Sequence, residues 1–184
     1  GGLGDDTMRG EGGDDVIHAD IGKDTAYGGD GNDTIYVSSE TDDQANLVDG
    51  GADDGAHDGV IGDVMVLQNL VDGGSYDFTA AGSLGENVTN IETLDINDGV
   101  STEVAFTAQD ILAMVSAGDA ATLTIKADAG DSLVITLDGT GTIEDDYGGS
   151  FVSGEVIAPG DGYTYTVVDT NGATDTASIH WIAA

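Results

Sequence analysis

A nine-residue repeat at the start of the chain constrains the fold more than any other feature of the sequence. Residues 1–36 divide into four consecutive nonapeptides, GGLGDDTMR, GEGGDDVIH, ADIGKDTAY and GGDGNDTIY. The first and fourth fit the template G-G-x-G-x-D-x-U-x, in which U is apolar, at every position. The second has Glu11 in place of a glycine, and the third keeps only Gly22, Asp24 and the small apolar Ala26. Four copies in phase are hard to obtain from a Gly- and Asp-rich composition alone.

The repeat positions predict a coil of parallel strands. Glycines permit backbone angles that other residues rarely adopt, so the first six residues of each repeat can turn tightly. The last three residues form a short strand. Two repeats complete one coil, so each repeat stacks on the second repeat after it as a parallel strand pair. The apolar residues that then point inward are Met8, Ile17, Ala26 and Ile35.

The aspartates of the repeats then lie above one another. Asp6 is expected near Asp24, and Asp15 near Asp33. Stacked carboxylates repel, and a Ca²⁺ ion between successive coils reverses the sign of that interaction, because it binds carboxylate and carbonyl oxygens as hard ligands. Zinc is a poor candidate, since the chain has no cysteine and its three histidines are scattered.

These residues resemble the β-roll of RTX (repeats-in-toxin) proteins. The resemblance implies that turn carbonyls and repeat aspartates bind calcium between coils. Two such sites would comprise the carbonyls of Gly2 and Gly4 with Asp6, opposite Asp24, and the carbonyls of Glu11 and Gly13 with Asp15, opposite Asp33.

The same resemblance implies further ligands in the later repeats. The carbonyls of Asp20 and Gly22, together with Asp24, would meet the degenerate stretch 37–45, where Asp42 occupies the aspartate phase. The last turn would be formed by Gly29, Gly31 and Asp33. The departures from the template at Glu11 and Asp20 weaken this assignment little, because the ligands there would be backbone oxygens.

The charge of the chain limits its partners. It has 36 acidic residues against 3 Lys and Arg, and a formal net charge of -33. Phosphate groups repel such a chain, so charge does not attract it to nucleic acid or to an anionic membrane. A divalent metal is the simplest cationic partner. The alternative is a merely solubilising acidic surface, which the fixed places of the aspartates disfavour. No apolar run approaches the roughly 18 residues of a membrane helix, so no direct membrane insertion is expected.

The rest of the chain predicts a second, mainly β region. We expect an all-β fold with a short parallel β-roll and its cap in residues 1–60, and a β-rich C-terminal domain in residues 61–184. Residues 46–66 are compatible with an irregular further repeat and an extra calcium site, or with an acidic loop. One helix is expected at about 108–116, where Thr107 and Asp110 form a capping box. The expected strands are 64–67, 91–96, 122–127 and 132–137, with a hairpin around Asn171-Gly172.

A second resemblance covers about residue 60 to the end. The strings VTNIETLDINDG, FTAQDILAM and TLTIKADAGDSLVI are similar to the C-terminal region of very large RTX adhesins of Gram-negative bacteria. The resemblance implies export by the type I secretion machinery, an uncleaved signal in the segment ending SIHWIAA, and an extracellular or cell-surface location. In ADAGD, Asp128 and Asp131 could hold another ion or form a solvated turn.

No catalytic set is visible in the sequence. There is no H-E-x-x-H pattern, and the serine in AGSLG lacks the strand-then-helix setting of a nucleophile. We therefore expect a non-enzymatic module that stays unfolded at low calcium and folds on export. Two alternatives stay open, namely the C-terminal module of a secreted RTX enzyme and a ligand-binding domain that recognises glycan or ice. Glycan binding favours clustered aromatics, and the aromatics available are Tyr27, Tyr36, Tyr76, Tyr147, Tyr163, Tyr165 and Trp181.

Overall fold

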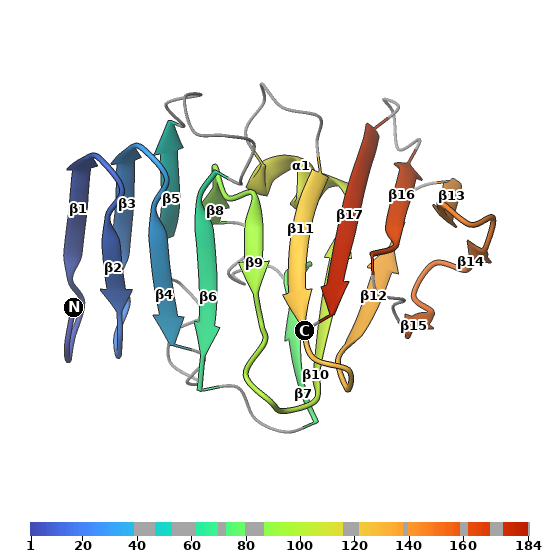
Figure 1. Ribbon diagram of the computed structural model, residues 1–184, viewed down its shortest axis with the longest axis horizontal. Helices are drawn as coiled ribbons and strands as arrows, with labels where there is room; N and C mark the ends of the chain where they lie inside the picture. Colours follow the sequence, from blue (N-terminus) through green and yellow to red (C-terminus); the bar gives the residue numbers. More distant parts are fainter. Residues whose placement is uncertain are drawn as a thin grey trace.

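The protein is mostly β-structure with one short helix, as the sequence predicts. The computed structural model describes residues 1–38, 47–52, 62–69, 73–79, 87–115, 122–137, 140–158, 162–169 and 175–183. Within these ranges the strands form three sheets. The strands follow one another along the long axis of the molecule, with the N-terminal coil at one end and residues 141–151 at the other (Figure 1).

The largest sheet runs along the whole molecule. Within the described residues it has nine strands, and the order from one edge to the other is β14 (Ser150–Phe151), β13 (Gly141–Asp145), β16 (Thr164–Asp169), β17 (Asp175–Ala183), β11 (Thr122–Ala127), β9 (Thr93–Asp95), β6 (Val64–Gln68), β4 (Thr34–Ser38) and β2 (Val16–Ala19).

Two shorter sheets complete the fold. Each has four strands in the part of the chain that the structure describes. The first consists of β1 (Thr7–Gly12), β3 (Thr25–Asp30), β5 (Leu47–Ala52) and β8 (Val88–Thr89). The second consists of β15 (Val156–Ile157), β12 (Ser132–Thr136), β10 (Thr102–Thr107) and β7 (Gly74–Asp77).

The repeats form the coil that their period predicts. Strand β1 pairs with β3 in parallel, with Thr7 opposite Thr25, and β2 pairs with β4 with Val16 opposite Thr34. Each repeat therefore stacks on the second repeat after it. Of the four apolar residues expected inside, Ile17, Ala26 and Ile35 are buried, and Met8 in the outermost coil is half-buried.

The parallel stacking continues after the repeats end. Strand β4 pairs in parallel with β6, β6 with β9, and β9 with β11. Strands from both sides of residue 60 thus share one sheet, while the proposed division into two domains at that residue stays a prediction.

Several later elements also match their predictions. Strands β6, β11 and β12 occupy the expected segments, whereas the strand expected at 91–96 is confined to Thr93–Asp95. Strands β16 and β17 pair antiparallel, which confirms the hairpin, although its turn at Asn171-Gly172 lies outside the described residues. Helix α1 (Ala108–Met114) begins at Thr107, whose hydroxyl accepts from Asp110 N at 3.1 Å, while the Asp110 carboxylate accepts from Thr107 N at 2.6 Å.

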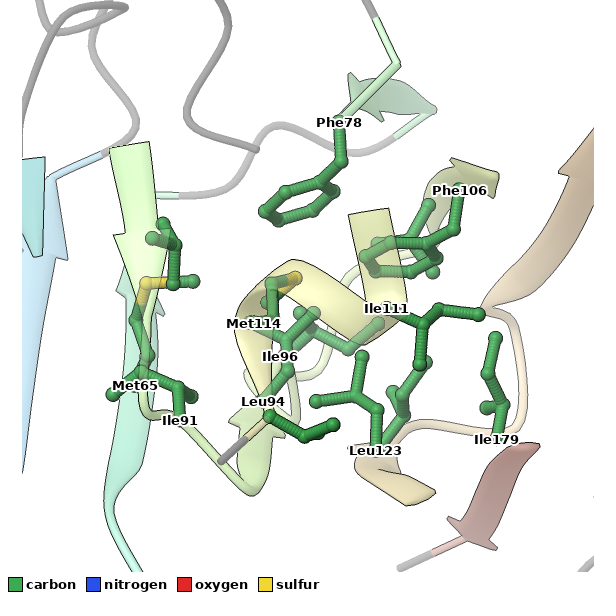
Figure 2. Packing of buried hydrophobic residues seen from close by; sticks show 14 of the residues in the cluster. Met65, Phe78, Ile91, Leu94, Ile96, Phe106, Ile111, Met114, Leu123 and Ile179 are labelled. Carbon is green, nitrogen blue, oxygen red and sulfur yellow. The ribbon is translucent and has the colours of Figure 1, made fainter. Parts of the chain in front are cut away.

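Helix α1 packs in the interior against strands of the large sheet and β10. Its residues Ile111 and Met114 are fully buried, and Figure 2 shows them beside Leu94 and Leu123 of the large sheet and near Phe106 of β10. The described part of the chain contains no helix with the length and apolar character needed to span a bilayer.

Candidate metal centre

The aspartates of successive coils are joined by hydrogen bonds along the roll. Asp6 N donates to Asp24 Oδ1 at 2.9 Å, and Asp15 N donates to Asp33 Oδ1 at 2.7 Å. The two pairs that the repeat register predicts are therefore neighbours in the structure. Each carboxylate reaches back to the backbone of the preceding coil, which fixes its position between the two coils.

One of these ladders extends beyond the repeats. Asp33 N donates to Asp63 Oδ1 at 2.6 Å, and Asp63 N donates to Glu92 Oε2 at 2.7 Å. Four coils thus carry a carboxylate ladder that runs through Asp15, Asp33, Asp63 and Glu92. The sequence indicated no partner for Asp33 in this region, because neither Asp63 nor Glu92 lies in a nonapeptide.

The turn carbonyls of the predicted sites also point from coil to coil. A methyl group on Gly31 would lie 2.6 Å from Gly13 O, and one on Gly22 would overlap Gly4 O. A methyl group on Gly29 would likewise overlap the carbonyl oxygen of Glu11, and one on Gly51 would overlap the carbonyl oxygen of Gly29. These glycines are required because a side chain would occupy the space into which the carbonyl of the preceding coil projects.

One of the predicted carbonyls has a hydrogen-bond donor within the fold. The carbonyl oxygen of Gly2 accepts a hydrogen bond from Ile21 N at 3.0 Å. The Asp20 side chain is half-exposed. Asp42 lies outside the described residues. The assignment of calcium ligands to these positions stays a prediction.

The carboxylates of the ladders are buried with little positive charge in the chain to balance them. Asp24, Asp33 and Asp63 are each 1% exposed. Burial raises the pKa of Asp33, and the carboxylates of Asp15 and Asp14 raise it further, while the hydrogen bond from the Asp15 backbone lowers it in part. The ionised form of Asp33 is therefore disfavoured in the fold unless a cation is present.

The comparison with known families agrees with this geometry. A model of the RTX calcium-binding nonapeptide repeat matches residues 1–36 in four copies. Residues 1–36 are RTX calcium-binding repeats. Neither the comparison with curated proteins nor that with solved structures found a match for the chain.

The donor set of the RTX repeats fits calcium. It consists of carboxylate and carbonyl oxygens, the hard ligands that this ion prefers. Asp33 Oδ2 is buried and has no hydrogen-bond partner among the described residues, as expected of an oxygen that a cation completes. Within the same residues no three His, Cys, Asp or Glu side chains converge on one point, so carbonyls must supply a large share of any ligand set.

The acidic turn at Asp128 and Asp131 has a structural role in the fold. Asp131 Oδ1 accepts from Thr102 N at 2.7 Å, and its Oδ2 accepts from Asp128 N at 2.6 Å. The carboxylate thus joins two successive coils through these hydrogen bonds. Of the acidic residues proposed for a cap in 46–66, Asp49 and Asp63 are described, and Asp53, Asp54 and Asp58 lie outside the described residues.

An aromatic cluster near the other end of the molecule was not expected from the sequence. The rings of Tyr147 and Tyr163 lie 4.5 Å apart between centroids, those of Tyr163 and Tyr165 6.4 Å, and those of Phe151 and Tyr165 5.8 Å. Antiparallel pairing of β13 with β14 and β16 brings them together. The spacing of tyrosines at 147, 163 and 165 carries no signal of this contact.

We expect the substitution Glu11→Gly to stabilise the roll. Glu11 has φ 75, a left-handed conformation that costs a residue with a side chain about 1–2 kcal/mol and that glycine adopts freely. The free energy of unfolding, measured with urea in saturating calcium, should rise by about 1 kcal/mol. Glu11→Gln keeps the backbone penalty and removes the charge, so it should have a much smaller effect. An equal gain in both variants would assign the effect to charge.

The raised pKa of Asp33 predicts acid stabilisation of the calcium-free protein. Its protonated form is favoured by the fold, so its contribution is full below the ordinary value of 3.8 and is lost as the pH rises through the raised pKa. In calcium-free buffer, far-UV circular dichroism should find Asp33→Asn more folded than the wild type at neutral pH, with the difference vanishing at acidic pH. Asp30→Asn, with an exposed side chain at the end of β3, is the control. A difference that does not depend on pH would contradict the assignment.

Proposed function

We propose that the protein is the calcium-dependent folding and secretion module of a large bacterial RTX adhesin and that it has no enzymatic activity. The observation that carries the proposal is the stack of buried aspartates along the roll, seen in the hydrogen bonds from Asp15 to Asp33 and from Asp33 to Asp63. Calcium would be held by these carboxylates and by the turn carbonyls of the repeats.

The chemistry that calcium supplies is neutralisation of the stacked carboxylates. With a net charge of -33, the chain repels itself, and burial of the ladder without cations adds to that penalty. Extracellular calcium modules bind with dissociation constants on the order of 10⁻⁴–10⁻³ M, far above the calcium concentration inside cells. The chain would therefore stay unfolded before export and fold outside, and folding at the exit would oppose its return through the secretion channel.

The position of the last strand supports export of the unfolded chain. Strand β17 lies between β11 and β16 in the large sheet, and its residues Ile179 and Trp181 are buried. A type I secretion signal in this segment would be hidden in the folded protein. It could be read by the secretion machinery only before the sheet forms, which requires that folding wait for calcium.

The adhesin assignment has a separate basis. It depends on the similarity of about residue 60 to the end to the C-terminal region of large RTX adhesins, and the three strings that carry the similarity contribute to strands β8 to β12 and to helix α1. RTX repeat proteins are typically secreted, which agrees with an extracellular or cell-surface location.

The calcium switch is tested by far-UV circular dichroism of the full chain in chelator and across a calcium titration, with magnesium for comparison. We expect β-structure to appear only with calcium. Asp24→Ala should move the calcium midpoint to higher concentration, because Asp24 is buried between coils and serves two of the predicted sites. Asp30→Ala removes the same charge from an exposed position at the end of β3 and should leave the midpoint nearly unchanged. A chain that is equally folded and equally stable in chelator would overturn the proposal.

The aromatic cluster favours glycan binding as a second candidate function. Tyr147 is 72% exposed and packs against Tyr163, so its ring offers a face on which a sugar could stack. The calcium-loaded chain would be applied to an array of neutral and acidic glycans. Binding that Tyr147→Ala abolishes and Tyr36→Ala retains would support this function, since Tyr36 stacks on His18 far along the sheet. Glycan binding that persists in Tyr147→Ala would exclude the cluster as the site.

A further inference from the structure

The roll has a cradle of oxygen atoms at the junction between the last nonapeptide and the coil that follows it. A methyl group on Gly28 would overlap both Asp33 Oδ2 and the carbonyl oxygen of Gly50. Both oxygens therefore point at the same small space beside the Gly28 backbone. Gly50 lies outside the matched repeats, in the coil that continues the roll after them.

One oxygen of this cradle, Asp33 Oδ2, accepts no hydrogen bond within the described residues. Asp33 is 1% exposed, and its Oδ2 has no hydrogen-bond partner within the described residues, whereas its Oδ1 accepts from Asp15 N. A buried carboxylate oxygen without a donor is costly, because it has lost its hydration and gained no replacement. A cation in contact with this oxygen removes the penalty.

A second carboxylate lies on the next coil. Asp63 is also 1% exposed, and its Oδ1 accepts from Asp33 N at 2.6 Å. A methyl group on Gly50 would overlap both Asp63 Oδ2 and the carbonyl oxygen of Asn90. The neighbouring coil has the same arrangement inside the repeats, where a methyl group on Gly10 would lie 2.7 Å from Asp15 Oδ2 and 2.5 Å from Gly28 O. The pattern of glycine, carboxylate and carbonyl thus continues without a nonapeptide.

We propose that Asp33, Asp63 and the carbonyl of Gly50 bind a further divalent cation of the calcium class at this junction. Two adjacent buried carboxylates and a carbonyl form a hard-oxygen donor set, and a singly charged ion would leave one negative charge uncompensated. The proposal extends the function proposed above to residues that no repeat contains.

The ion at this site couples the repeats to the remainder of the fold. The carbonyl oxygen of Asp63 accepts hydrogen bonds from Glu92 N and Thr93 N, both at 3.1 Å, at the start of β9. Asp63 N in turn donates to Glu92 Oε2. A cation that fixes Asp63 therefore fixes the register of β9 in the large sheet, so calcium binding to the roll promotes ordering of the strands that follow.

The site is tested by counting the calcium ions bound to the full chain at saturating calcium, by equilibrium dialysis and native mass spectrometry. Asp63→Asn should bind one ion fewer than the wild type. Asp49→Asn is the matched control, because Asp49 lies in the same coil on the opposite face of β5 from Gly50, and it should bind the same number as the wild type. Equal numbers in the wild type and in Asp63→Asn would overturn the junction site and leave the calcium sites of the repeats intact.

A wild-type chain that binds no calcium would instead overturn the function proposed above. Asp63→Asn could also fail to fold, which circular dichroism would detect. In that case anomalous diffraction from wild-type crystals soaked with terbium locates the ions directly. A peak between the carboxylates of Asp33 and Asp63 is expected, and filled repeat sites without this peak would refute the proposal.

Discussion

The fold depends on one repeated contact, in which the backbone N–H of an aspartate donates to the carboxylate of the aspartate on the next coil. Asp6 with Asp24 and Asp15 with Asp33 are the first two instances. Each hydrogen bond favours the ionised carboxylate. The same contact brings the carboxylates into a buried column, where they repel one another and lose hydration. The geometry that holds the coils together therefore carries an electrostatic penalty that a cation in the column would remove, and this conflict is the physical basis of the proposed response to calcium.

The two ends of the molecule are stabilised by different interactions. In the repeats the interior is narrow and contains small or single apolar residues, such as Ala26 and Ile35, so little apolar area is available to offset the entropy of ordering the chain. Towards the C-terminus the interior holds helix α1 and the rings of Phe78, Phe106 and Trp181, all of them buried. Apolar burial therefore contributes more to the stability of this part than it does in the repeats. Direct pairing of β4 with β6 and of β6 with β9 joins the two parts in one sheet.

The sequence predicts the parts of this structure that repeat or that are local. The period of nine fixes the register of β1 with β3, and the capping box at Thr107 fixes the start of α1. Strands β7 and β10 were missed, since residues 74–77 contain two polar residues and a glycine, and residues 102–107 lie beside the helix signal. The place of Asp63 could not be foreseen either, because coil length is constant only within the repeats. Beyond the repeats, the loops differ in length, and their lengths decide which residue lies opposite which on the next coil. The sequence therefore has no period that indicates which aspartate will face Asp33.

Varying coil length also explains why the cation column lies where it does. Closing a longer loop costs more chain entropy, although the increase is slow, and parallel pairing always requires such a loop. The hairpin of β16 and β17 closes a short loop and buries Tyr165 and Trp181, so apolar burial offsets more of the chain entropy lost in its formation. The pairing of β4 with β6 closes a long loop between Ser38 and Val64, beside an interior of aliphatic side chains such as Ile35 and Met65. The buried carboxylates of Asp33 and Asp63 meet at this same long closure, where their repulsion adds to the entropic cost. A cation bound there would convert that repulsion into an attraction between coils, and the strands that follow would then have an ordered edge on which to pair.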